Sequence, residues 1–131
     1  MTEAPQERRL RVLVVDDRRD SALLLHALLE HAGYEVATAD SGEKGLGAFR
    51  QFKPDAIISD IALLGALDGY DLARAVKSES AVSPRFIAVT GHDDDDHRQR
   101  ATEAGFQHFL VKPPDIDELL SILTGLTRRA Q

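Results

Sequence analysis

Short apolar runs alternate with longer amphipathic stretches along most of this chain. The run over residues 56–60 shows no polar alternation and the run over residues 12–15 is rich in β-branched residues, which is typical of strands buried on both faces of a parallel sheet. The run that begins at Ala56 is the clearest, because it stops abruptly on Asp60. The pattern predicts strands at residues 12–15, 34–39, 56–60, 85–89 and 109–111.

The stretches between these runs have the spacing of helices with one apolar face. Residues suited to helix N-caps, namely Ser41, Asp68 and Asp115, stand before three of them. Glycines at positions 42, 45 and 47 weaken the second helix by about 1 kcal/mol each relative to alanine. Helices are predicted over residues 21–32, 41–52, 68–79 and 93–104, with a last one from residue 115.

The first predicted helix has an apolar face and is ended by Gly33. Leu23 lies nearly opposite that face, so we expect it either to be a scattered surface leucine or to contact a partner protein. The residues predicted to share the apolar face are Leu24, Leu25, Leu28, Leu29 and Ala32.

The alternation of strands and helices predicts an α/β fold. We expect a flavodoxin-like, doubly wound, five-stranded parallel sheet in the order 2-1-3-4-5, with five helices and right-handed crossovers. Residues 10–127 carry the pattern and are predicted to form one domain. Residues 1–9 are polar and are predicted to be a disordered leader, and residues 128–131 a short tail.

Composition narrows the function classes. The chain has 131 residues and a net charge of −6, with 16 Lys and Arg against 22 Asp and Glu, so direct nucleic-acid binding is not expected. The chain contains no cysteine, which excludes disulfides and thiolate metal sites. Neither a signal peptide nor a run of about 20 apolar residues is present, so we expect a cytoplasmic protein without a membrane partner.

Polar residues follow four of the five predicted strands: Asp16 and Asp17, Asp60, Thr90, and Lys112. In open α/β sheets these strand ends meet at the ligand crevice. Clustered carboxylates repel one another, and a hard cation such as Mg²⁺ or Mn²⁺ removes that penalty. A lysine and a threonine hydroxyl can bind phosphate oxygens, which leaves Asp60 as a candidate nucleophile for phosphoryl transfer.

With these residues in place, the chain resembles the receiver domain of bacterial two-component response regulators over residues 10–126. The matching segments are Val14-Val15-Asp16-Asp17, Ile58-Ser59-Asp60, Asp68-Gly69-Tyr70, Val89-Thr90-Gly91, Ala104-Gly105 and Val111-Lys112-Pro113.

The resemblance implies that Asp60 accepts a phosphoryl group from a phosphohistidine on a histidine kinase or a histidine phosphotransfer protein. It further implies that Asp16 and Asp17 hold Mg²⁺ and that Thr90 and Lys112 bind the phosphoryl oxygens. Thr90 and Phe109 would switch the surface formed by the fourth helix, the fifth strand and the fifth helix, which a downstream protein target reads. Such a protein turns over no separate substrate, and its Lys-Pro bond at positions 112–113 is cis.

The chain departs from the family pattern in three places. Leu64 replaces the usual proline and Asp68-Gly69 comes one residue late, so the loop over residues 61–67 is longer than usual. This places in question the family's use of the Ala62 carbonyl as a metal ligand. Phe109 stands where many receivers have the switching tyrosine, and His92 occupies a position that tunes water access to the acyl phosphate.

Several alternatives stay open from the sequence. The chain could be a receiver fragment of a hybrid histidine kinase or of a longer regulator, or a protein-binding pseudo-receiver without phosphorylation. An aspartyl-phosphate hydrolase needs Asp-x-Asp after the first strand, which Asp16-Asp17-Arg18 does not provide. The acidic run between His92 and His97 is interpreted as a solvated helix start in preference to a metal site, because acids favour helix N-termini.

Overall fold

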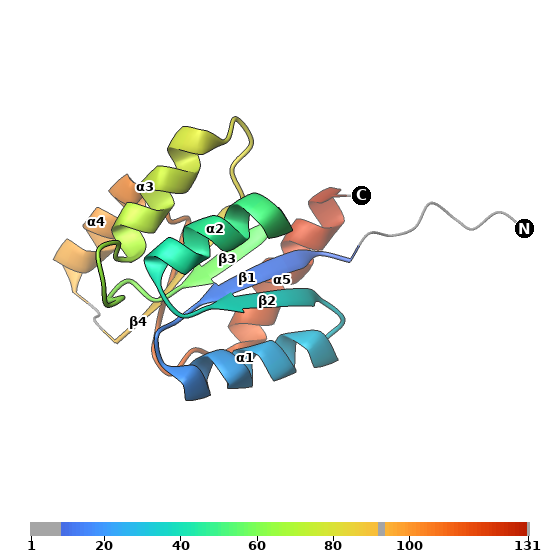
Figure 1. Cartoon of the computed structure of the whole chain (residues 1–131). Coiled ribbons are helices and arrows are strands. Elements are labelled where there is room, and N and C mark those ends of the chain that lie inside the picture. Colours follow the sequence, from blue (N-terminus) through green and yellow to red (C-terminus); the bar gives the residue numbers. More distant parts are fainter. Residues whose placement is uncertain (1–8, 92–93, 131) are drawn as a thin grey trace, which may run out of the picture.

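The computed structural model describes residues 9–91 and 94–130. Its strands form one parallel sheet in the predicted order, β2-β1-β3-β4-β5. The sheet runs through the middle of the molecule, with helices on both of its faces (Figure 1). The strands are β1 (Arg11–Val15), β2 (Glu35–Ala39), β3 (Ala56–Ser59), β4 (Arg85–Thr90) and β5 (His108–Val111).

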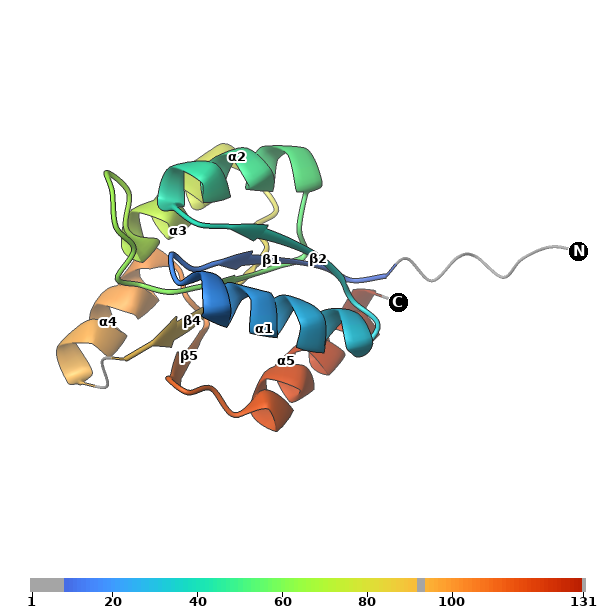
Figure 2. The ribbon, with the colours of Figure 1, turned by 60° about the horizontal axis from the view of Figure 1, so that its bottom comes forward.

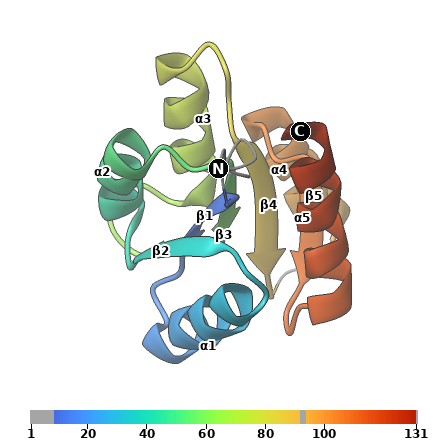
Figure 3. The same ribbon diagram turned by 90° about the vertical axis from the view of Figure 1, so that its right-hand side faces the viewer.

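The helices divide between the two faces, as Figures 2 and 3 show from two further directions. Helices α2, α3 and α4 contribute to the core on one face, and α1 and α5 to the core on the other. Their bounds are α1 (Arg19–His31), α2 (Gly42–Phe52), α3 (Gly69–Glu79), α4 (Asp95–Ala104) and α5 (Ile116–Ala130).

Strand β1 explains why its apolar run has no polar alternation. Val12 and Val14 point into the core beneath α1 and α5, whereas Leu13 and Val15 point into the core beneath α2 and α3. All four side chains are at most 1% exposed. Because full burial of such a side chain contributes about 1.5–3 kcal/mol, both faces of the central strand favour apolar residues.

The predicted apolar face of α1 is wrong at Leu24, which is 61% exposed, and at Ala32, which is also exposed. The buried stripe of the helix is formed by Ala22, Leu25 and Leu29. Consecutive residues of a helix differ by 100° in direction, and of the adjacent pair Leu24 and Leu25 only Leu25 lies on the buried stripe. Leu28 is half-buried, at the border of the stripe.

Side-chain caps begin several helices, as predicted. The Ser41 hydroxyl accepts a hydrogen bond from the Lys44 amide at the start of α2. Asp68 forms a capping box with Asp71 at the start of α3. At the start of α5, Asp115 accepts from two backbone amides of the first turn. These caps satisfy donors that an α-helix leaves unpaired and fix where each helix begins.

The predicted leader lies outside the described residues except for Arg9. The Arg9 guanidinium donates hydrogen bonds to the carbonyls of Gly33 and Tyr34. At the other end, α5 continues to Ala130. Within the described part of the chain, we find no helix with the length and apolar character needed to span a bilayer.

Candidate functional site

The register of the sheet brings the strand ends together. Val15 pairs with Ser59 across β1 and β3, so Asp16 and Asp60, the next residues, leave neighbouring strands at the same level. The Asp60 amide donates a hydrogen bond of 3.0 Å to the Val15 carbonyl, which extends the pairing to the last residue before the loop. The two carboxylates are therefore neighbours because their strands are paired in this register.

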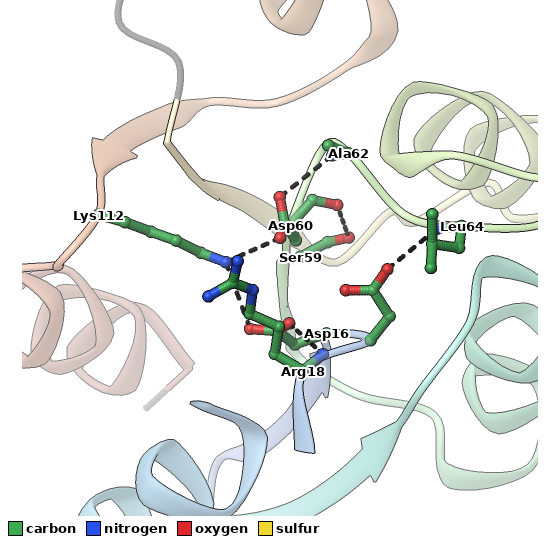
Figure 4. Close-up of polar contacts among 8 residues, drawn as sticks. Asp16, Arg18, Ser59, Asp60, Ala62, Leu64 and Lys112 are labelled. Carbon is green, nitrogen blue, oxygen red and sulfur yellow. Dashed lines mark hydrogen bonds and ion pairs between the residues drawn. The ribbon is translucent and has the colours of Figure 1, made fainter. Parts of the chain in front are cut away.

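Asp16, Asp17 and Asp60 each place a carboxylate oxygen within 4.8 Å of the others. Lys112, which follows β5, reaches across from the other side (Figure 4). Its ammonium nitrogen lies 2.8 Å from Asp60 Oδ2 and 3.6 Å from Asp16 Oδ2. One lysine thus neutralises part of a cluster of three carboxylates.

Burial sets the electrostatics of this cluster. Asp16 and Asp60 are 5% and 9% exposed. Burial raises the pKa of the Asp16 carboxyl, since it disfavours the charged form. The Arg18 amide and the Lys112 ammonium oppose this shift, and the negative charges of Asp60 and Asp17 add to it.

Backbone amides hold one oxygen of each carboxylate. The Arg18 amide donates to Asp16 Oδ1 at 2.8 Å, and the Ala62 amide donates to Asp60 Oδ1 at 3.1 Å. The Leu64 amide donates to Asp17 Oδ2 at 3.1 Å. Ala62 thus contacts the site through its N–H group, and the metal-binding role of its carbonyl stays a prediction.

Thr90 and Lys112 occupy adjacent strand ends. Thr90 is the last residue of β4 and is fully buried. Its carbonyl accepts a hydrogen bond of 2.7 Å from the Lys112 amide, so the backbones of the two residues are fixed against each other. The peptide bond between Lys112 and Pro113 is cis, as the family resemblance implied.

The lengthened loop over residues 61–67 closes through a tight contact beside Asp60. The Gly69 amide donates a hydrogen bond of 2.9 Å to the Ile61 carbonyl. A methyl group built on Gly69 would lie 2.5 Å from the Asp60 carbonyl oxygen, so only glycine permits this approach. The loop therefore begins and ends at the same place, and the start of α3 packs against the end of β3.

Phe109, the predicted switch residue, is half-buried in β5. The guanidinium carbon of Arg98, in α4, lies 4.6 Å from the centre of its ring. A cation over an aromatic face is attracted by the ring's quadrupole. This contact ties α4 to β5 in the region predicted to change on phosphorylation, and sequence spacing did not indicate it.

The acidic run before α4 forms a helix start. Asp94 is the N-cap, and its Oδ1 accepts from the His97 amide at 2.8 Å and contacts the His97 ring at 2.7 Å. Asp96 also has an oxygen within 4.8 Å of these groups, but Asp94 and Asp96 are both exposed. His92 and Asp93 lie outside the described residues, so the predicted effect of His92 stays untested.

A cavity of about 480 Å³ opens beside the carboxylates, between α1, β2 and α2. Asp16, Asp17, Leu23 and Lys44 are among the residues that line it. Leu23 is 53% exposed, as predicted. Two of the three clustered carboxylates, those of Asp16 and Asp17, thus line a cavity together with an exposed apolar residue.

Comparison with known proteins agrees with this geometry. A family model described as the response regulator receiver domain matches residues 12–124. Among solved structures, the chemotaxis protein CheY4 of Vibrio cholerae matches with a TM-score of 0.80 and 28% identity, over 90% of this chain and 98% of that one.

Two curated relatives are much longer than this chain. The virulence sensor protein BvgS of Bordetella pertussis is 35% identical over 128 residues, which cover 92% of this chain and 10% of that protein. The alkaline phosphatase synthesis transcriptional regulatory protein PhoP of Bacillus subtilis is 30% identical over 121 residues, which cover 92% of this chain and 50% of the regulator. The chain thus spans a tenth of one relative and half of the other.

Proposed function

This chain belongs to the response regulator receiver domain family, and from that premise we propose that it is a phosphoryl acceptor in a two-component phosphorelay, with Asp60 as the acceptor. The observation that carries the proposal is the contact of 2.8 Å between Asp60 Oδ2 and the Lys112 ammonium at the end of the sheet. The contact places a positive charge in an otherwise acidic pocket, where it can bind a phosphoryl group next to the Asp60 nucleophile.

In the proposed reaction, a carboxylate oxygen of Asp60 attacks the phosphorus of a phosphohistidine. The P–N bond breaks, and its electron pair stays on the imidazole nitrogen, which takes up a proton. The product is an acyl phosphate on Asp60. The Ala62 amide holds Asp60 Oδ1 and thereby orients the carboxylate for the attack.

Lys112 and Thr90 serve the incoming phosphoryl group in this proposal. Lys112 exchanges its contact with Asp60 Oδ2 for one with a phosphoryl oxygen, which compensates charge during transfer. The Thr90 hydroxyl donates to a second oxygen. Thr90 is the last residue of β4, which pairs with β5. Movement of Thr90 toward the phosphoryl group would therefore change the position of Phe109 and the α4-β5-α5 surface.

The three carboxylates fit a hard divalent cation, because clustered oxygen ligands at the end of a sheet are what Mg²⁺ or Mn²⁺ binds. Asp16, Asp17 and Asp60 would hold the ion. When bound, it supplies positive charge that offsets the negative charge of the phosphoryl oxygens. Asp16, despite its raised pKa, would then be held ionised by the cation.

The proposed partners are a protein that carries a phosphohistidine and a downstream protein that distinguishes the two states. The family's domains are signalling modules, and the net charge of −6 favours a protein partner over nucleic acid. A cytoplasmic site of action and a domain over residues 10–127 are part of the same proposal. The sensor and regulator relatives make a larger hybrid kinase or regulator the proposed alternative context for this chain.

Labelling with a small-molecule phosphodonor such as phosphoramidate in the presence of Mg²⁺ tests the assignment. We expect wild type to incorporate one phosphoryl group that hydroxylamine removes, as it does from an acyl phosphate. Asp60→Asn should incorporate none, whereas Asp117→Asn, an exposed acid in the first turn of α5, should label like wild type.

The same experiment separates the competing functions. An unlabelled wild type would favour a pseudo-receiver that only binds proteins. Labelling that survives hydroxylamine, or that persists in Asp60→Asn, would overturn Asp60 as the acceptor. Continuous release of phosphate from simple phosphate monoesters would favour a hydrolase.

A further inference from the structure

The lengthened loop is held by two acidic side chains. The Leu64 amide donates to Asp17 Oδ2 at 3.1 Å, and the Ala66 amide donates to Glu43 Oε2 at 3.3 Å. A methyl group built on Gly65 would lie 3.4 Å from both oxygens of Glu43, so the carboxylate packs directly against the loop backbone. Asp17 and Glu43 are therefore connected through a short stretch of backbone.

The side chain of Glu43 is exposed, but its position in the helix is fixed. It lies in the first turn of α2, which begins with the Ser41 cap. A methyl group built on Gly42, the preceding residue, would collide with the Leu67 carbonyl oxygen, so α2 and the end of the loop are in close contact. The start of α2 thus packs against the end of the loop and fixes where the Glu43 side chain begins.

Asp17 depends on this loop more than its neighbours do. Asp16 and Asp60 each accept a hydrogen bond from the amide of the residue two positions later in the chain, within the same turn. The amide that holds Asp17 comes from Leu64, 47 residues away. Asp17 is also the most accessible of the three carboxylates, so it is less confined by packing than Asp16 and Asp60 are.

We propose that Glu43 is a positioning residue for the divalent cation, because it holds the loop so that the Leu64 amide keeps the Asp17 carboxylate beside Asp16 and Asp60. The inference rests on the proposed metal site and adds a residue that the family resemblance did not supply. A carboxylate that is already oriented binds an ion with a smaller loss of conformational freedom. Loss of the Glu43 support should therefore weaken the ion's binding without unfolding the domain.

Titration calorimetry with Mg²⁺, and Mn²⁺ binding followed by electron paramagnetic resonance, test this proposal in high salt. Outer-shell changes typically cost 10–100-fold in metal affinity, and for this more distant support we expect Glu43→Ala to cost about threefold to tenfold. Glu43→Gln keeps an oxygen that accepts from the Ala66 amide and should stay within about twofold of wild type. Glu103→Ala, which removes an exposed acid from α4, is the matched control and should not change the affinity.

Amide hydrogen exchange adds a measurement of the loop itself, which does not depend on the change in net charge. The amides of Leu64 and Ala66 should exchange faster in Glu43→Ala than in wild type, and Glu43→Gln should restore their protection. Circular dichroism and the melting temperature verify that both variants are folded.

The other possible outcomes distinguish failure of the positioning role from failure of the metal site. Equal weakening by Glu43→Ala and Glu43→Gln would mean that the charge of Glu43, and not its support of the loop, affects the ion. Unchanged affinity in Glu43→Ala beside clear binding by wild type would overturn the positioning role alone. A wild type that binds neither Mg²⁺ nor Mn²⁺ would overturn the metal site of the proposed function and, with it, this inference.

Discussion

At the scale of single residues, Asp16 combines deep burial with two acidic neighbours. Burial raises its pKa, and its contact of 3.6 Å with Lys112 is longer than that of Asp60. Proteins often keep such unfavourable charges where function needs them, at a cost in stability. The metal-free fold therefore carries an electrostatic penalty at this position.

We expect Asp16→Asn to raise the free energy of unfolding of the metal-free protein by about 0.5–2 kcal/mol, because a neutral amide of the same shape is less costly to bury. Urea denaturation in a chelator measures this change. The same variant should gain no stability from Mg²⁺. A loss of stability in the chelator would show that the contacts of Asp16 with Lys112 and the Arg18 amide outweigh the burial.

His108 makes stability depend on pH at the opposite end of the sheet. Burial lowers its pKa, Arg85 lowers it further, and Glu118 opposes the shift. A lowered pKa means that the unfolded chain binds the proton more tightly than the folded chain does. Stability should therefore be retained above the ordinary histidine pKa of about 6.5 and should fall as the pH drops below it, until His108 is protonated in the folded state too.

Thermal melts of wild type and His108→Gln between pH 5 and about pH 8 measure this dependence, over the range in which histidine titrates. Wild type should lose more stability than His108→Gln toward low pH. His31→Gln, at an exposed position at the end of α1, should behave like wild type. Parallel profiles for wild type and His108→Gln would contradict the role of His108.

At the scale of elements, the sequence predicted the strands well because β1, β3 and β4 are buried on both faces. It placed α1 within two residues at both ends but misassigned Leu24, since a cluster of adjacent leucines does not reveal which of them faces the sheet. It could not identify Glu43, because the contact of Glu43 with the loop depends on how far α2 lies from β3. The switch role of Phe109 was predicted from the resemblance and stays a prediction. Its contact with Arg98 could not be predicted, because it joins α4 and β5, whose distance from each other only the fold defines.

The glycines of α2 show the same limit of sequence reasoning. By helix propensity all three weaken the helix, but the structure separates them. Gly42 approaches Leu67, and a methyl group on Gly45 would lie 3.1 Å from Val15, so both permit close packing. Nothing lies within 4 Å of a methyl group on Gly47.

We therefore expect Gly47→Ala to stabilise the protein by about 0.5–1 kcal/mol, the propensity difference between the two residues. Gly42→Ala should destabilise it, because the added methyl group would collide with the Leu67 backbone. Urea denaturation of the two variants beside wild type measures both effects. If both substitutions changed stability in the same direction, helix propensity or packing alone would govern α2. The distinction drawn between Gly42 and Gly47 would then be wrong.

At the scale of the whole molecule, the candidate site joins segments that are distant in sequence. Asp16 and Asp17 follow β1, Asp60 follows β3 and Lys112 follows β5, so the cluster exists only when the sheet is assembled. The unfolded chain has no such arrangement. A ligand of this cluster therefore binds the folded state selectively and must shift the folding equilibrium.

We expect Mg²⁺ to raise the melting temperature of wild type, with a stabilisation of about 2.7 kcal/mol when the free ion reaches 100 times its dissociation constant. Differential scanning calorimetry at constant ionic strength measures the shift, with NaCl replaced stepwise by MgCl₂. Asp17→Asn removes one of the three carboxylates and should lose most of the stabilisation, whereas Asp117→Asn, which removes an exposed acid that is not part of the cluster, should keep it. With a net charge of −6, the surface also attracts cations nonspecifically, and an equal shift in all three proteins would assign the effect to that attraction instead of to the cluster.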